Sequence, residues 1–347
     1  MPGWAQRFPA LGRLQATTLA LRLGRNLGLG GGSEQQAWVP PAAAADVAAR
    51  RRDDLPAAIR ARWDAVVEVL GADAAERALL GRAMADRALA GGSGIEAIEF
   101  LARSWGDLTD AERSQVAAPL RPGGGSGPGP LFLAGAPARQ TDQTTCGPTV
   151  LAMLAAAGDP LLALWLVTGQ SLAGQLPREV RAVDPAQRSA ADAATRFGAL
   201  QRAIKTRSNA GGLGPLPWPA ALGTPPWGAP RVARYPGATF SDVMIDDTDA
   251  AGFGALLDRA DRALAAGVPV PLFTGGDLAS GVATAVPRHV VLLTGSSAAP
   301  GSDRYAIFEP ASGAVHVLSR TELLAPAGAR SALGGWSHVC WAVLPGA

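Results

Sequence analysis

Cysteine and histidine are scarce in this chain, which has two cysteines and three histidines among its 347 residues. The two cysteines, Cys146 and Cys340, cannot form the disulfide framework that is typical of small secreted domains. Neither stands beside a second cysteine or a histidine at the spacing typical of zinc ligands. We therefore predict a protein of a reducing compartment that requires neither a metal nor a cofactor.

Long uncharged apolar runs and an excess of charge are absent as well. The longest apolar stretch, residues 151–169, is interrupted by Asp159 and Pro160, and the N-terminal run 14–24 is broken by Arg22. A membrane span needs about 18 or more apolar residues, and a signal peptide needs an uninterrupted apolar core and a cleavage site. The net charge is +2, too small to suggest nucleic-acid binding. We expect no integral membrane segment, no nucleic-acid partner and a cytoplasmic location.

The first part of the chain, residues 1–40, is a basic segment that is poorly defined by its pattern. It has no acidic residue before Glu34, and several leucines fall on one face of a helix. A basic amphipathic helix is typical of a surface that binds an anionic membrane or a partner. The alternative, which we favour, is a helix packed on its own protein or a poorly ordered terminus.

Residues 41–120 are rich in alanine and have helical periodicity. One segment contains five apolar residues at helical spacing, which predict one buried stripe: Ile59, Trp63, Val66, Val67 and Leu70. Thr109 and Glu112 form the pattern of a capping box and predict a last helix over 110–119. We predict a small all-helical domain that offers a surface to a protein partner.

The segment 121–130 reads RPGGGSGPGP and has the composition of a linker. It separates the helical domain from a second domain over 131–347. The order of elements in this second domain, helices first and strands afterwards, is typical of an α+β fold. The helices are predicted over 161–168, 190–205 and 248–266, and the strands over 239–247, 268–273, 288–295, 303–310, 314–319 and 337–344.

Cys146 stands at the start of another helix of this domain. Four apolar residues after it recur at helical spacing: Val150, Met153, Leu154 and Ala157. Thr144 and Thr145 are suitable N-cap residues, and Pro148 is tolerated in a first turn. The free N–H groups and the dipole at a helix N-terminus favour a thiolate, the nucleophilic form of cysteine.

A cysteine nucleophile needs a base, and His289 is the best candidate because it opens an apolar run that predicts a buried strand. His316 and His338 alternate with apolar residues on strands and are interpreted as structural. Cys340 lies in the middle of a strand and is interpreted as a buried, inert thiol.

The segment 209–237 is dense in proline and glycine and contains Trp218, Trp227 and Tyr235. A loop of this length in a compact domain is usually functional or disordered, and the tryptophans argue against disorder. Two interpretations remain open. It is either a lid that contacts substrate beside the active site or a loop fastened to the body by its aromatic residues.

Four segments in the same order as in a known family carry a resemblance. Gln140 stands six residues before a Cys-Gly-Pro segment that opens an apolar helix. A Gly-x-Pro-Val segment follows at 267–270, then the strand of His289, and then FEPASG with Glu309 where the family usually has Asp. Over about residues 131–320 the chain resembles the papain-like cysteine peptidases of the bacteriocin-processing, double-glycine-leader type.

The resemblance implies a fold in which the cysteine helix packs on an antiparallel sheet, and a site made of Cys146, His289, Glu309 and Gln140. Glu309 would orient His289, and the Gln140 amide would stabilise the oxyanion together with the Cys146 backbone N–H. Gln143 is the second choice for the Gln140 role. The implied activity is hydrolysis of a peptide or isopeptide amide in a peptide or protein substrate through a thioester. The alternatives are an inactive binding module and a thiol acyltransferase or deamidase on the same fold.

Overall fold

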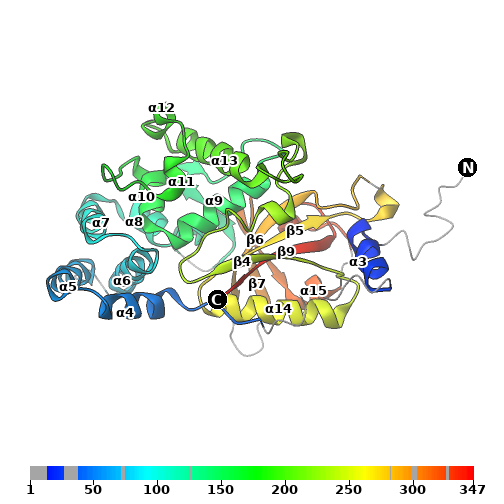
Figure 1. Cartoon of the computed structure of the whole chain (residues 1–347), viewed down its shortest axis with the longest axis horizontal. Helices are drawn as coiled ribbons and strands as arrows, with labels where there is room; N and C mark the ends of the chain where they lie inside the picture. The colour runs from blue at the N-terminus through cyan, green and yellow to red at the C-terminus, as the bar shows by residue number, and fades with distance from the viewer. Residues whose placement is uncertain are drawn as a thin grey trace, which may run out of the picture.

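The computed structural model describes residues 14–26, 38–71, 75–124, 127–281, 283–297, 303–325 and 328–347. In these ranges the chain forms a mixed α+β structure with 13 α-helices and a seven-stranded antiparallel sheet. Helices dominate the N-terminal half of the chain, and strands dominate the C-terminal half. Most of the helical part lies beside the sheet (Figure 1). The α+β class with a helical N-terminal part is thus confirmed. Residues 1–13 and 27–37, which carry much of the predicted basic segment, lie outside the described residues.

The helices of the N-terminal half come first in the sequence, and only three very short β segments lie among them. Its helices are α3 (Ala16–Asn26), α4 (Ala44–Asp53), α5 (Ala57–Gly71), α6 (Ala75–Ala90), α7 (Ile95–Asp107), α8 (Asp110–Ala117), α9 (Cys146–Gly158), α10 (Pro160–Thr168), α11 (Arg178–Arg181), α12 (Pro185–Arg188) and α13 (Ala193–Asn209). The predicted capping box is present, because the Thr109 side chain accepts from the Glu112 N–H and Glu112 accepts from the Thr109 N–H. Local sequence patterns therefore predicted the helices over 41–120 and helices α9, α10 and α13, but not the short helices α11 and α12.

The sheet contains seven antiparallel strands in the spatial order β1-β8-β7-β6-β5-β9-β4. The strands are β1 (Gly129–Pro130), β4 (Thr239–Met244), β5 (Val270–Gly275), β6 (His289–Ser297), β7 (Arg304–Glu309), β8 (Ala314–Ser319) and β9 (His338–Gly346). A separate two-stranded ribbon pairs β2 (Phe132–Leu133) with β3 (Ala136–Pro137). Every strand predicted over 239–344 is present, and β5 and β9 are almost entirely buried because both lie in the interior of the sheet.

Helices pack against the sheet, and one of them, α9, lies against the strand that carries His289. Helix α9 packs against β6, while α14 (Ala250–Ala265) packs against β5, β6 and β9. The short helix α15 (Arg320–Leu324) follows β8, with α14 beside it (Figure 1). The N-terminus of α9 consequently faces the first residue of β6, and this junction contains the candidate site.

One hydrophobic core extends through both halves of the chain. Helix α10 contacts α6, α7 and α8 as well as α9 and α13, and its side chains are almost all buried. The predicted linker also takes part in the structure, since β1 pairs with β8 at the edge of the sheet. The domain boundaries at 41–120, 121–130 and 131–347 stay predictions. The two expected domains share an apolar contact surface through α10.

Helix α3 is attached to the strand-rich half of the chain. Its Arg22 bonds to the carboxylate of Asp246 at 2.8 Å and to the Thr248 hydroxyl at 2.6 Å, and the Ala16 N–H donates to the Ala285 carbonyl. Within the described part of the chain no single helix has the length and hydropathy to cross a membrane. Only α9 and α10 together meet that requirement, with a bend of 114° between them.

Candidate active site

Cys146 is the first residue of α9, as predicted, and 5% of its surface is exposed. The predicted N-cap differs in detail, since the Thr145 side chain caps no N–H group of the helix. Its hydroxyl instead bonds to the carbonyl and N–H of Asp142, which closes the turn before the helix. Among the described residues, the N–H groups of Cys146 and Gly147 have no protein acceptor. Two donors at the positive end of α9 are therefore available to a ligand beside the sulfur.

The turn before Cys146 is held from two sides. Gln201, fully buried in α13, accepts from the Thr141 N–H and donates to the Arg139 carbonyl. On the other side, the Gln140 N–H donates to the Pro310 carbonyl at 2.9 Å. Pro310 directly follows Glu309. The segment before the nucleophile and the turn after β7 are thus joined directly.

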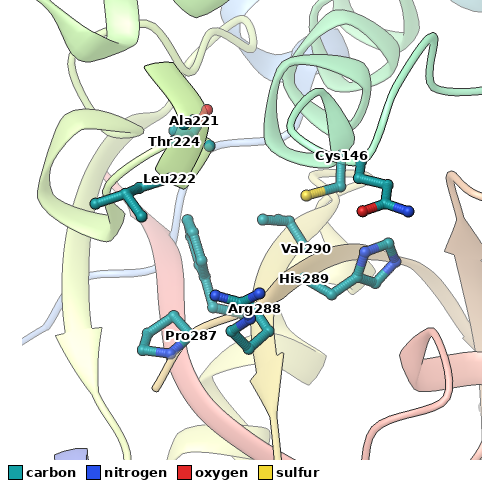
Figure 2. Close-up of a pocket in the computed structure, with 11 residues that line it drawn as sticks. Cys146, Ala221, Leu222, Thr224, Pro287, Arg288, His289 and Val290 are labelled. Carbon is teal, nitrogen blue, oxygen red and sulfur yellow. The ribbon is translucent and has the colours of Figure 1, made fainter. Parts of the chain in front are cut away.

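His289 is the first residue of β6 and is opposite Thr274 of β5 in the sheet register. Its side chain is buried, and its imidazole faces the sulfur of Cys146 (Figure 2). Gly334 packs against the ring, because a Cβ at this position would overlap the imidazole Cδ2 and approach Nε2. The ring is therefore held between the helix start and a backbone segment that has no side chain.

Glu309, the last residue of β7, bonds to the Nε2 atom of the His289 ring. Its Oε1 lies 2.7 Å from the His289 Nε2 and accepts from the Ala311 N–H, while Oε2 accepts from the Ser312 N–H, both at 2.7 Å. Glu309 is 4% exposed. It is ionised in this environment, so Nε2 must carry the proton, and Nδ1 is left to face Cys146. The structure brings Cys146, His289 and Glu309 into one chain of contacts.

The charges of this pair stabilise each other. Burial alone would lower the pKa of His289, but hydrogen bonding to Cys146 and Glu309 outweighs it and raises the pKa to about 9. Burial would raise the pKa of Glu309, but its bonds from His289, Ala311 and Ser312 lower it to about 2. Near neutral pH the site therefore holds an imidazolium between the sulfur and a carboxylate.

Gln140 does not line the cleft beside Cys146. Its Nε2 donates to the Asp142 carbonyl at 3.0 Å, and its Oε1 is buried without a hydrogen-bond partner in the described part of the chain. Gln143, the second choice from the sequence, does line the cleft. The assignment of the oxyanion donor to Gln140 stays a prediction, and it requires the Gln140 side chain to turn from its present position.

A cleft opens at Cys146 and His289, and the proline- and glycine-rich segment forms one of its walls. Residues 221–224 lie opposite residues 287–290, which lead into β6 and include its first two residues (Figure 2). The helix start contacts this wall closely, since a Cβ added to Gly147 would lie 2.8 Å from the Thr224 side chain. Segment 209–237 is thus in place to contact a substrate, as one of the two interpretations of it requires.

The same segment is also fastened to the body, as the other interpretation requires. The rings of Trp218 and Trp227 meet edge to face at 5.2 Å, and Trp227 packs on Trp341 of β9 at 6.1 Å. Near its C-terminal end Arg234 bonds to the carboxylates of the half-buried Asp159 and the buried Glu179, each at 2.7 Å. Segment 209–237, which forms this wall of the cleft, is therefore anchored to the rest of the protein at both its tryptophans and Arg234.

The remaining histidines and the second cysteine lie outside the cleft. His338 pairs with Asp247 at 3.0 Å, both buried, and this carboxylate outweighs burial and raises the pKa of His338. His316 contacts the Ser312 hydroxyl. Cys340 is fully buried, burial raises the pKa of its thiol, and the Sγ donates to the Phe273 carbonyl. In the described residues no three His, Cys, Asp or Glu side chains are grouped as metal ligands.

The Gly334 contact leads to a prediction about ring positioning. We expect Gly334→Ala to displace the His289 imidazole and to lower the rate at which iodoacetamide alkylates Cys146 by about tenfold, because misplacement of about 1 Å is costly in such sites. Gly335→Ala is the matched control. Both glycines have positive φ, at 69° and 82°, but a Cβ at Gly335 meets no atom within 4 Å. If both variants slow alkylation equally, backbone strain rather than the ring contact is responsible.

Comparisons with protein-family models, with curated proteins and with solved structures find no match to this chain.

Proposed function

We propose that this chain is a papain-like, cysteine-dependent hydrolase of peptide or isopeptide amides that acts through a thioester. The observation that carries the proposal is the arrangement of three buried side chains. Cys146 begins α9, His289 faces its sulfur, and Glu309 bonds to the opposite ring nitrogen at 2.7 Å. This is the order of nucleophile, base and orienting group that thiol catalysis requires.

The first half-reaction uses the charge on His289. The Cys146 thiolate attacks the amide carbon, a C–S bond forms, and the carbonyl π electrons move to the oxygen. The N–H groups of Cys146 and Gly147, which have no acceptor within the described ranges, can donate to that oxyanion. When the intermediate collapses, the C–N bond breaks and the Nδ1 proton of His289 goes to the leaving amine.

The second half-reaction releases the acyl group. His289, now neutral, accepts a proton from water through Nδ1 while the water oxygen attacks the thioester carbon. The C–S bond then breaks, and Cys146 and His289 return to the thiolate and imidazolium forms. An amine acceptor in place of water would give acyl transfer. We propose hydrolysis because the cleft is open to solvent and water is the most abundant acceptor.

Glu309 supports an active site rather than an inactive binding module. A glutamate in the usual position of an aspartate suggests a decayed site only if it fails to reach the histidine. Here its carboxylate contacts the imidazole and two backbone N–H groups. The N–H groups of Ala311 and Ser312 hold the carboxylate of this longer side chain in place against the ring.

Alkylation by iodoacetamide tests the proposal without a known substrate. At neutral pH we expect Cys146 to react at least about tenfold faster than Cys340, because Cys146 lies at a helix start beside an imidazolium and Cys340 is fully buried. Peptide mass mapping after timed exposure gives both rates in one sample. Equal rates would contradict the proposal.

His289→Gln is the control that separates thiol activation from simple access. The variant leaves Cys146 in the cleft but removes the imidazolium beside its sulfur. We expect its Cys146 to react about tenfold slower than the wild-type residue near pH 7. An unchanged rate in this variant would show that accessibility alone makes Cys146 faster than Cys340.

A further inference from the structure

Arg288 stands beside the catalytic histidine and lines the cleft, and its side chain has no counter-ion within the part of the chain that the structure describes. Its backbone N–H donates to the Thr274 carbonyl at 2.8 Å, which fixes the residue at the start of β6. The side chain is exposed. Figure 2 shows the guanidinium below the space between Leu222 on one side and Cys146 with His289 on the other.

The other groups that line the cleft leave this charge uncompensated. No carboxylate is among the lining residues, and apart from the reacting pair the remainder are uncharged. The imidazolium of His289 is balanced by the Glu309 carboxylate, which bonds to its ring at 2.7 Å. The Arg288 guanidinium is therefore the cation of the cleft lining that has no carboxylate beside it in the described residues, and it is located where a substrate must lie to reach the sulfur.

The carboxylates near the cleft are already engaged. Glu309 is buried and bonded to His289 and to two backbone N–H groups. Asp142 accepts from the N–H and hydroxyl of Thr144, and the ammonium of Lys205 bonds to the same hydroxyl. The guanidinium, a planar group with five donors, is thus left for a ligand, and a carboxylate fits its fork with two parallel hydrogen bonds.

Apolar residues line the same cleft and limit what else binds there. Pro287 precedes Arg288, Val290 and Phe273 line the cleft, and Leu222 on the opposite wall is 57% exposed. An exposed leucine beside an unpaired arginine is suited to a chain segment that combines an acidic group with an aliphatic one.

We infer that Arg288 is a specificity-determining residue that binds a carboxylate of the substrate close to the amide attacked by Cys146. This inference rests on the proposed thiol hydrolase activity and adds the substrate class, a peptide with an acidic group near the scissile bond. The carboxylate belongs either to an aspartate or glutamate side chain or to the C-terminus of the peptide. Both sources present the same group to the guanidinium.

The test compares two alkylating agents that differ in one group. Iodoacetate carries a carboxylate and iodoacetamide a neutral amide, and both react with the Cys146 thiolate. The ratio of their rate constants cancels any change in thiolate population and isolates the attraction of the carboxylate. We expect Arg288→Gln to lower the iodoacetate-to-iodoacetamide ratio by about three- to tenfold at low salt, and the wild-type ratio to fall as salt is added.

Two variants control for charge and shape. Arg288→Lys keeps the charge but loses the fork, and we expect a ratio between those of the wild type and Arg288→Gln. Arg103→Gln removes one exposed positive charge from α7, which does not line the cleft, and should leave the ratio unchanged. An equal decrease in Arg103→Gln and Arg288→Gln would overturn the inference, as would an unchanged ratio in Arg288→Gln.

Failure of the proposed function has a different signature. Slow reaction of Cys146 with iodoacetamide itself, at the rate of Cys340, would overturn both the hydrolase and the carboxylate site. Normal iodoacetamide reactivity with an unchanged ratio would overturn the carboxylate site alone.

Short peptides then identify the source of the carboxylate. Each peptide is tested for how well it protects Cys146 from iodoacetamide. One pair of peptides differs only by an internal glutamate or glutamine, and the other differs only by a C-terminal carboxylic acid or amide. Better protection by the glutamate form identifies a side chain, and better protection by the acid form identifies the terminus. In either case the advantage should disappear in Arg288→Gln. Equal protection within both pairs would overturn the inference.

Discussion

Replacing Cys146 by alanine is expected to remove all amide hydrolysis while changing the free energy of unfolding by no more than about 1 kcal/mol. The thiol is small and lies at a helix start beside an open cleft, so its loss leaves no large cavity in the core. In the proposed mechanism the sulfur is the atom that forms the thioester, and no second thiol reaches the cleft in the described structure. Turnover of a fluorogenic peptide library and thermal unfolding give the two readouts.

Cys340→Ala is the matched control for this substitution. It removes a thiol of the same size that is fully buried in β9 and donates to the Phe273 carbonyl. We expect this variant to keep its activity and to lose about 1 kcal/mol or more of stability, the reverse of the result for Cys146→Ala. Residual activity above about 1% in Cys146→Ala would assign the nucleophile to another residue.

Local sequence patterns were sufficient to predict most elements of the fold. The helix start at Cys146, the capping box at Thr109 and all six strands over 239–344 are formed by short-range preferences that the tertiary structure does not override. The same preferences predict that His289 begins a strand and that Glu309 ends the next one. Antiparallel pairing of β6 with β7 then brings the two side chains together.

Contacts between distant segments account for the features that sequence patterns do not predict. The packing of Gly334 on the His289 ring depends on a turn 45 residues away along the chain, and the Gly-Gly pair at this turn is its only local sign. Arg288 is an ordinary surface residue in the sequence and becomes distinctive only because no carboxylate of the described residues lines the cleft with it. The attachment of α3 likewise depends on Asp246, more than 200 residues away.

Segment 209–237 shows why two opposed interpretations of a loop can describe the same structure. Its tryptophans fasten it to β9, and this attachment holds residues 221–224 in the wall of the cleft. Composition indicated an ordered loop, but only the packing of Gly147 against Thr224 places it beside the helix start. In the proposed hydrolase, such a fixed wall requires no closing motion before the substrate binds.

Glu309→Gln is expected to lower the rate of hydrolysis by about tenfold or more and to shift its pH dependence. Glutamine has one acceptor oxygen where glutamate has two, so its amide nitrogen must face an N–H donor of Ala311, Ser312 or His289. The unsatisfied donor and the lost charge should reduce the free energy of unfolding by about 2 kcal/mol.

The two pKa shifts determine where on the pH scale this loss is seen. The pKa of His289 is raised from 6.5 to about 9, so its contribution to stability is complete below pH 6.5 and is lost as pH rises through 9. The pKa of Glu309 is lowered from 4.5 to about 2, so its contribution is complete above pH 4.5 and is lost as pH falls through 2. The stability difference between the wild type and Glu309→Gln should therefore be largest between pH 4.5 and 6.5 and should shrink above pH 9.

The pH dependence of kcat/KM should shift in the same sense. The wild type loses its imidazolium only near pH 9, whereas in Glu309→Gln burial is opposed by Cys146 alone and the alkaline limb should move to lower pH. Glu309→Asp keeps the charge with one methylene fewer, and we expect it to retain much of the activity and an alkaline limb near that of the wild type. An alkaline limb in Glu309→Gln that coincides with the wild-type limb would mean that another group orients His289, and the 2.7 Å contact would then have a structural role only.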